Sequence, residues 1–254
     1  MRMLKKDGYY KKTVKFSCGI QIVTKCKMPT LGKGGKREPK TQPSTERQEK
    51  KNLNKSIEKL HHLLLANFHP GDFNLVLTHT DKTGYDREAA KKTVQKFIAM
   101  YTAYCTKHGY KADYIYNTEQ HKDGRLHHHI VLHNHGDLPQ IKLLWEKQAG
   151  GGLVVHKPRN YMLWADYDWY GLAAYFCGVK EDGTVIYRHP KGERRYIPSH
   201  GLKKPEITYE WIDANRWYKP RAPKGWYVVP ETIRSSMDEE TGGGFIKYLM
   251  KRVD

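Results

Sequence analysis

Glu119, His127 and His129 have the types and the spacing of metal ligands. Side chains alternate between the two faces of a β-strand, so His127 and His129 share one face and His128 points to the other. Asp123-Gly124 is a strong turn signal, and the hairpin that it predicts folds Glu119 back beside the two histidines. A carboxylate with two imidazoles and open coordination positions suits Mg²⁺ or Mn²⁺ bound to a phosphate, and also zinc or iron.

The neighbouring histidines have other interpretations. An isolated His-x-His pair on a strand can simply pack or form hydrogen bonds, and that alternative stays open for His127 and His129. His128 shares its face with apolar residues, which predicts that it is packed or hydrogen-bonded. We interpret His133 and His135 as surface or loop residues. The spacing excludes a nucleotide hydrolase of the histidine-triad type, because Val131 occupies the third alternate position.

The elements that must position these residues alternate between strands and helices. Thr45 and Gln48 have the spacing of a helix-capping box. Asp182-Gly183 gives a second hairpin signal. The predicted elements are short strands within 11–25, a helix over 45–66, a strand at 73–79, a helix over 87–107, strands at 110–119 and 126–133, a helix over 139–147 and a helix capped by Asp168. This pattern predicts an α+β fold with a central antiparallel sheet flanked by helices.

The charge of the chain points to a polyanionic partner. The 254 residues contain 45 Lys+Arg against 27 Asp+Glu, a formal net charge of +18. Such an excess is unusual for an enzyme that acts on small molecules and is expected of a polyanion binder. Residues 1–60 carry 17 Lys+Arg and 5 Asp+Glu, a net +12. The first sixty residues are therefore interpreted as a clamp for a nucleic-acid backbone, with a solvated basic arm as the alternative.

Composition also sets the expected domains and compartment. Residues 31–44 are rich in Gly, Pro and Lys, which predicts a flexible loop. We expect a basic N-terminal arm with short strands over 1–44, a main domain over 45–210 and a C-terminal extension over 211–254 that packs on the core. The four cysteines are scattered, and no stretch approaches the roughly 20 apolar residues of a membrane span. These features predict a cytoplasmic protein without a membrane partner.

Three segments in this order resemble a known superfamily. They are NLVLTHT (74–80), a strand ending in Leu-Thr; GRLHHHIVLH (124–133), with two histidines flanking one residue; and DYDWYGLAAYFCGVKEDG (166–183), a helix that carries tyrosines. Together they resemble the motifs of the HUH endonucleases, specifically the rolling-circle replication initiators of plasmids and phage-like elements. The stretch 45–78 and KKPEI (203–207) add to this similarity, which covers roughly residues 40–210.

The resemblance implies a fold, a chemistry and a set of residues. It implies a ferredoxin- or RRM-like nuclease sheet, and a divalent ion, Mg²⁺ or Mn²⁺, on Glu119, His127 and His129. It also implies site-specific nicking and joining of single-stranded DNA through a 5′-phosphotyrosine, which initiates rolling-circle replication. Tyr175 matches the nucleophile best, with Tyr170 and Tyr167 as alternatives.

Two positions depart from the family pattern. His128 fills the middle of the metal motif, where a bulky apolar residue is usual. Gly178 stands three residues after Tyr175, where the family usually has lysine, and the next lysine is Lys180. We therefore predict Tyr175 and Lys180 as catalytic residues.

The expected substrate is single-stranded or hairpin DNA at a replication origin. Basic residues would contact its backbone, and aromatic residues would stack on bases or form a second apolar layer. The predicted DNA-binding residues are Lys50, Lys51, Lys55 and Arg125, and the aromatic candidates are Trp145, Tyr161, Trp164 and Trp169. The chain has no GxxxxGK[ST] motif, which favours an initiator that works with a host helicase and polymerase.

Other functions remain open at this stage. A mobilisation relaxase or a transposase would use the same chemistry on another substrate. A non-catalytic nucleic-acid-binding protein with a degenerate nuclease fold is a further alternative, favoured slightly by the missing lysine. A zinc hydrolase unrelated to DNA is disfavoured by the net charge of +18.

Overall fold

The computed structural model describes residues 8–27, 45–80, 82–149, 153–154, 163, 169–180, 182–187, 189–190, 192–213, 215–238 and 243–253. The chain forms two compact units, residues 44–203 and residues 1–43 with 204–254. Each unit contains one five-stranded sheet, in which the paired strands of the described residues are antiparallel. The α+β class is thereby confirmed. The predicted loop over 31–44 and the candidates Tyr161, Trp164, Tyr167 and Asp168 lie outside the described residues.

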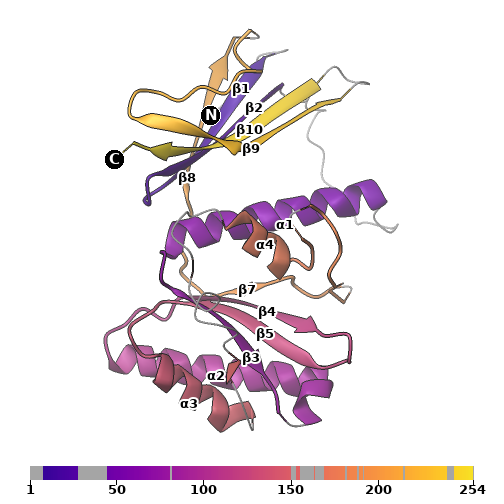
Figure 1. Ribbon diagram of the computed structural model, residues 1–254, viewed down its shortest axis with the longest axis vertical. Coiled ribbons are helices and arrows are strands. Elements are labelled where there is room, and N and C mark those ends of the chain that lie inside the picture. Colours follow the sequence, from indigo (N-terminus) through magenta and orange to yellow (C-terminus); the bar gives the residue numbers. More distant parts are fainter. Residues whose placement is uncertain are drawn as a thin grey trace, which may run out of the picture. The chain divides into compact units, whose positions relative to one another are not determined.

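The unit over 44–203 contains a sheet with the strand order β6-β3-β5-β4-β7. Its elements, in chain order, are α1 (Glu46–Asn67), β3 (Phe73–Thr78), η1 (Lys82–Tyr85), α2 (Arg87–Lys107), β4 (Tyr114–Gln120), β5 (Leu126–Leu132), α3 (Leu138–Ala149), β6 (Leu153–Val154), α4 (Tyr170–Phe176) and β7 (Ile197–Pro198). Figure 1 shows α2 and α3 on one face of this sheet and α1 and α4 on the other.

Local signals explain where the long helices begin and end. Thr45 caps α1, since its side chain accepts a hydrogen bond from the backbone N–H of Gln48 at 3.3 Å. Asp86 caps α2 in the same way, accepting from two backbone N–H groups. Gly109 follows α2 with a φ of +70°, a conformation that terminates helices at low cost for glycine. The N–H of Tyr110 donates to the carbonyl of Cys105 at the end of α2, and β4 begins at Tyr114 rather than at the predicted residue 110.

Apolar side chains fill the space between this sheet and the helices α2 and α3. The cluster combines β3, β4 and β5 with residues from both helices: Phe73, Leu75, Leu77, Val94, Phe97, Tyr101, Cys105, Tyr116, Ile130, Leu132, Ile141, Leu144 and Trp145. This packing gives the sheet one closed face. The side chains that could hold a metal therefore lie on the opposite face, toward α4.

The second unit joins the two ends of the chain in one sheet. Its strands β1 (Tyr9–Phe16), β2 (Ile20–Lys27), β8 (Glu206–Ile212), β9 (Trp226–Asp238) and β10 (Gly243–Arg252) have the order β8-β1-β2-β10-β9. The strands expected in the basic arm thus exist, and they occupy interior positions of the sheet. The domain boundaries at 44/45 and 210/211, the basic extension and the ferredoxin-like topology stay predictions. Among the helices of the described residues, none has the length and apolar character needed to cross a membrane.

Candidate metal centre and its tyrosine

The hairpin formed by β4 and β5 brings the predicted ligands together. Gly124 has a φ of +86° in the connecting turn, a conformation that glycine adopts without strain. The register places Glu119 opposite His127, and the next pair on the same face places Asn117 opposite His129. One ligand atom from each of Glu119, His127 and His129 lies within 4.8 Å of the others. The hairpin prediction is confirmed, and the three side chains form one cluster.

The cluster has the geometry of a ligand set around a shared carboxylate oxygen. Oε2 of Glu119 lies 3.0 Å from Nε2 of His129 and 3.5 Å from Nε2 of His127. All three side chains are largely buried. Burial acts to raise the pKa of Glu119, but hydrogen bonds and positive charge from the two histidines outweigh it and lower this pKa. The carboxylate therefore stays ionised, which metal binding requires.

His128 serves the opposite face, as predicted. It is fully buried, its Nδ1 lies 2.9 Å from Oγ1 of Thr118, and its Nε2 lies 3.1 Å from Nε2 of His79. Burial lowers the pKa of His128 well below its usual value, so the ring is neutral. The imidazole thus fills the position of a bulky apolar residue by packing beside Trp145.

The strand of the first motif lines the same hairpin. β3 pairs with β5 so that Thr78 lies opposite His127 and Val76 lies opposite His129. The carbonyl of Thr78 accepts a hydrogen bond from the indole N–H of Trp145 at 2.9 Å. Trp145 and Trp169 are both fully buried, so the expectation that they stack on bases is wrong, because neither ring reaches the surface.

Tyr175 extends from α4 to the metal cluster. Its hydroxyl lies 3.3 Å from Nε2 of His129, and the two rings meet edge to face with centroids 4.9 Å apart. Burial raises the pKa of Tyr175, and the negative charge of Glu119 raises it further. The alternative Tyr170 begins α4 and packs edge to face against His61 of α1, at 5.6 Å. The two tyrosines therefore face different neighbours.

Asn117 fixes the end of α4 and was not singled out from the sequence. Its Nδ2 donates to the carbonyl of Phe176 at 3.2 Å and also contacts the hydroxyl of Tyr187. Tyr187 in turn donates to the same carbonyl. Asn117 precedes Glu119 by two residues, and the alternation of the strand already placed both on one face. That signal could have identified Asn117 as a neighbour of the site.

Gly178 replaces the usual lysine for a backbone reason. Its φ is +85°, and a Cβ at this position would lie 2.5 Å from the carbonyl oxygen of Tyr187. The N–H groups of Ile186 and Tyr187 both donate to the carbonyl of Gly178. No side chain fits this turn without movement of the backbone. Lys180 lies two residues beyond, and its side chain is exposed.

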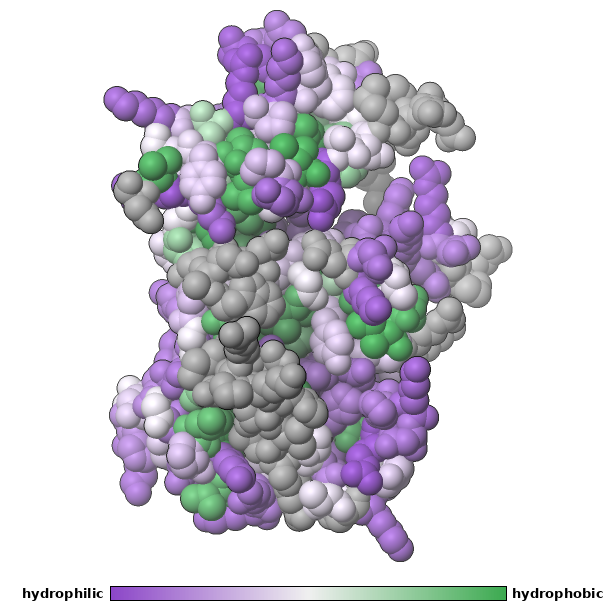
Figure 2. Space-filling model, in the orientation of Figure 1, coloured by the Kyte–Doolittle hydropathy of each residue, from purple (hydrophilic) through white to green (hydrophobic). Residues whose placement is uncertain are grey.

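The predicted DNA contacts are basic and accessible. Lys50, Lys51 and Lys55 are exposed on the N-terminal half of α1, where Figure 2 shows hydrophilic side chains. Arg125 lies two residues before His127. Its guanidinium stacks on the ring of Tyr85 at 5.3 Å and donates to the Tyr85 hydroxyl.

The donor set fits a divalent metal ion. Ligand atoms about 2.1 Å from one ion are separated by about 3 to 3.5 Å, close to the distances between Glu119 and the two histidines. The Glu119 carboxylate and the neighbouring tyrosine oxygen add oxygen donors that hard ions prefer. The cluster can therefore bind a metal, and its donor types alone do not select one.

Comparison with known proteins gives a match for this part of the chain. Neither the curated proteins nor the solved structures contain a match. Residues 74–177, which run from β3 to the end of α4 and include the candidate metal centre and Tyr175, match the family model of the replication-associated protein ORF2.

Proposed function

We propose that this protein nicks and rejoins single-stranded DNA at a specific site and thereby starts rolling-circle replication. The observation that carries the proposal is the Tyr175 hydroxyl, which lies 3.3 Å from His129 in the Glu119–His127–His129 cluster. The match of residues 74–177 to replication-associated proteins supports origin DNA as the substrate.

The reaction is a transfer of a phosphodiester bond. Tyr175 Oη attacks the phosphorus and loses its proton, the bond from phosphorus to O3′ breaks, and the O3′ takes up a proton. The products are a 5′-phosphotyrosine and a 3′-hydroxyl that can prime synthesis. The covalent link keeps a phosphodiester bond in place, so the 3′-hydroxyl of a second strand end can reverse the reaction without ATP.

Each residue of the cluster has a distinct part. Glu119, His127 and His129 would hold a divalent ion, Mg²⁺ or Mn²⁺. Such an ion would supply positive charge to the scissile phosphate and to the attacking oxygen. Asn117 holds the end of α4 and so keeps Tyr175 beside the cluster. We assign Lys180, the first lysine after Tyr175, to neutralising the phosphate.

The basic side chains would hold the backbone of the DNA. Lys50, Lys51 and Lys55 lie exposed along α1, and Arg125 lies next to the metal hairpin. The Arg125–Tyr85 pair combines a cation with a ring, a combination that suits an unpaired nucleotide. Recruitment of a host helicase and polymerase completes the proposal, since the chain has no GxxxxGK[ST] motif of its own.

A nicking assay on single-stranded origin DNA tests the function. With Mn²⁺ or Mg²⁺ we expect a 3′-hydroxyl product and a covalent protein–DNA adduct whose peptide carries Tyr175. Tyr175→Phe abolishes the adduct, whereas the matched control Tyr170→Phe keeps it, because Tyr170 packs against His61. An adduct that persists in Tyr175→Phe would show that the nucleophile is another residue. Binding without cleavage by the wild-type protein would establish a non-catalytic function.

The metal centre has its own test. EDTA and the His127→Ala/His129→Ala double variant should both reduce nicking to background, because each removes the charge at the phosphate. Normal nicking by the double variant would overturn the assignment of the cluster. A titration of nicking with Mg²⁺ and Mn²⁺ then identifies the preferred ion.

A further inference from the structure

A second cluster of metal-binding side chains lies at the other end of the same sheet. His69 follows the end of α1, Asp72 immediately precedes β3, and His133 immediately follows β5. The register pairs Phe73 with Leu132, so the two strands deliver Asp72 and His133 to the same edge. We propose that His69, Asp72 and His133 bind a divalent transition-metal ion of the zinc class, at a site separate from the Glu119 cluster.

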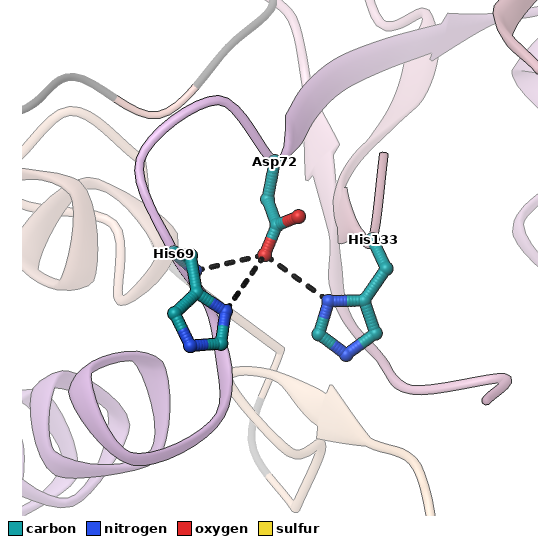
Figure 3. A group of neighbouring side chains, drawn as sticks. All are labelled: His69, Asp72 and His133. Atoms are coloured by element: carbon teal, nitrogen blue, oxygen red, sulfur yellow. Dashed lines mark hydrogen bonds and ion pairs between the residues drawn. The ribbon is translucent and has the colours of Figure 1, made fainter. Parts of the chain in front are cut away.

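The distances suit a single ion. Nδ1 of His133 lies 3.1 Å and Nδ1 of His69 lies 3.9 Å from Oδ2 of Asp72. Figure 3 shows the two rings on either side of this oxygen, with both Nδ1 atoms turned toward it. Ligands about 2.1 Å from a tetrahedral ion stand about 3.4 Å apart, so only His69 has to move. The His69 side chain is 67% exposed and can make this adjustment.

Two of the three ligands are already held in place. Oδ2 of Asp72 accepts from the backbone N–H of His69 at 2.8 Å, and Oδ1 accepts from the N–H of Asn134 at 3.1 Å. His133 packs on the ring of Phe68, with centroids 5.1 Å apart. A carboxylate and an imidazole held in this way lose little freedom when they bind an ion.

A buried carboxylate behind His133 gives the independent support. Oδ2 of Asp113 lies 3.5 Å from Nε2 of His133, on the side of the ring away from Asp72, and the Asp113 side chain is 4% exposed. An imidazole that donates Nε2–H to a carboxylate keeps the lone pair of Nδ1 for a metal, an arrangement that accompanies most metal-ligating histidines. The tautomer that Asp113 favours is the one that the proposed site needs.

The two sites are far enough apart to fill independently. His129 and His133 are four residues apart along the chain, which corresponds to about 13 Å at about 3.3 Å per residue. Two imidazoles and one carboxylate favour zinc or cobalt over magnesium. The ion would join the segment after α1 to the end of β5 and would stabilise this end of the sheet, whether or not the protein nicks DNA.

Metal counting on the untagged full chain tests the proposal. The metal-free protein is titrated with Co²⁺, and the bound ion is followed by its visible absorption and by equilibrium dialysis. We expect two ions per wild-type chain and one in the His127→Ala/His129→Ala variant. Adding His69→Ala to that variant should weaken the remaining ion at least about tenfold, whereas the control His135→Ala should leave it unchanged. Zn²⁺ should displace the bound Co²⁺.

The outcomes separate this site from the proposed function. If the His127→Ala/His129→Ala variant binds no ion, or if His69→Ala leaves the affinity unchanged, the proposal is wrong and Asp72 and His133 form an ion pair only. An Asp113→Asn variant gives a second test, because a weaker Co²⁺ affinity is expected where the ring orientation is lost. These measurements do not depend on nicking, so a failed nicking assay leaves them interpretable.

Discussion

Substituting Gly178 tests why this chain lacks the lysine that the related initiators carry three residues after the tyrosine. The φ of +85° at Gly178 costs a residue with a side chain about 1–2 kcal/mol. The contact at 2.5 Å between a new Cβ and the carbonyl oxygen of Tyr187 adds about 1–3 kcal/mol, the usual cost of overpacking. Because two N–H groups bond to the Gly178 carbonyl, the turn cannot move away without losing them. Gly178→Ala should therefore destabilise the protein by about 2–5 kcal/mol.

Gly183 provides the matched control. Its φ is +89°, and a Cβ there would meet no atom within 4 Å. Gly183→Ala should therefore cost only the backbone contribution, about 1–2 kcal/mol. Urea unfolding of both full-length variants, followed by far-ultraviolet circular dichroism, gives the difference that belongs to the Tyr187 contact. Equal losses of stability in the two variants would refute this explanation of the missing lysine.

The functional counterpart is Gly178→Lys, which restores the family residue. We expect a lower melting temperature and slower nicking than in the wild-type protein, because the substitution disturbs the turn that follows Tyr175. Faster nicking with unchanged stability would show that the turn tolerates a side chain and that the lysine was lost for another reason.

The same contacts lead to three more predictions. Trp145→Phe should destabilise the protein by about 1–3 kcal/mol in urea unfolding, because it removes the buried hydrogen bond to the Thr78 carbonyl; an unchanged midpoint would contradict this. Asn117→Ala should slow single-turnover nicking about 10- to 100-fold with unchanged DNA affinity, because the Phe176 carbonyl loses its anchor, and a loss of affinity instead would argue against a positioning role. Replacing three lysines of α1 by alanine should reduce the salt dependence of single-stranded DNA binding by about 2 in log–log slope, whereas the same change on the far face of the sheet should leave it unaltered. The α1 set is Lys50, Lys51 and Lys55, and the control set on α2 and α3 is Lys107, Lys142 and Lys147.

The sheet order changes how the basic N-terminal segment can be tested. Deleting residues 1–44 would remove β1 and β2, which are interior strands of the sheet that β8, β9 and β10 complete. A loss of DNA binding after such a deletion would therefore report an unpaired sheet as well as lost charge. Neutralising individual exposed lysines keeps the backbone pairing and is the sharper test.

Short-range signals along the chain were enough to predict the local elements and the metal motif. The strand predicted at 126–133 is β5 at Leu126–Leu132, and the helix predicted over 45–66 is α1 at Glu46–Asn67. Alternation of side chains on a strand, a two-residue turn signal and a capping threonine all act over a few residues. The same rules placed Glu119, His127 and His129 on one hairpin face before any tertiary contact was known.

Which distant segments meet could be learned only from the folded chain. The contact of Tyr175 with His129 depends on how α4 packs on the sheet, and the meeting of Asp72 with His133 depends on the register of β3 against β5. The pairing of the first strands with the last strands of the chain has the same origin. Such contacts join residues that are tens of positions apart, and they are set by the packing of whole faces, which no local pattern in the sequence encodes.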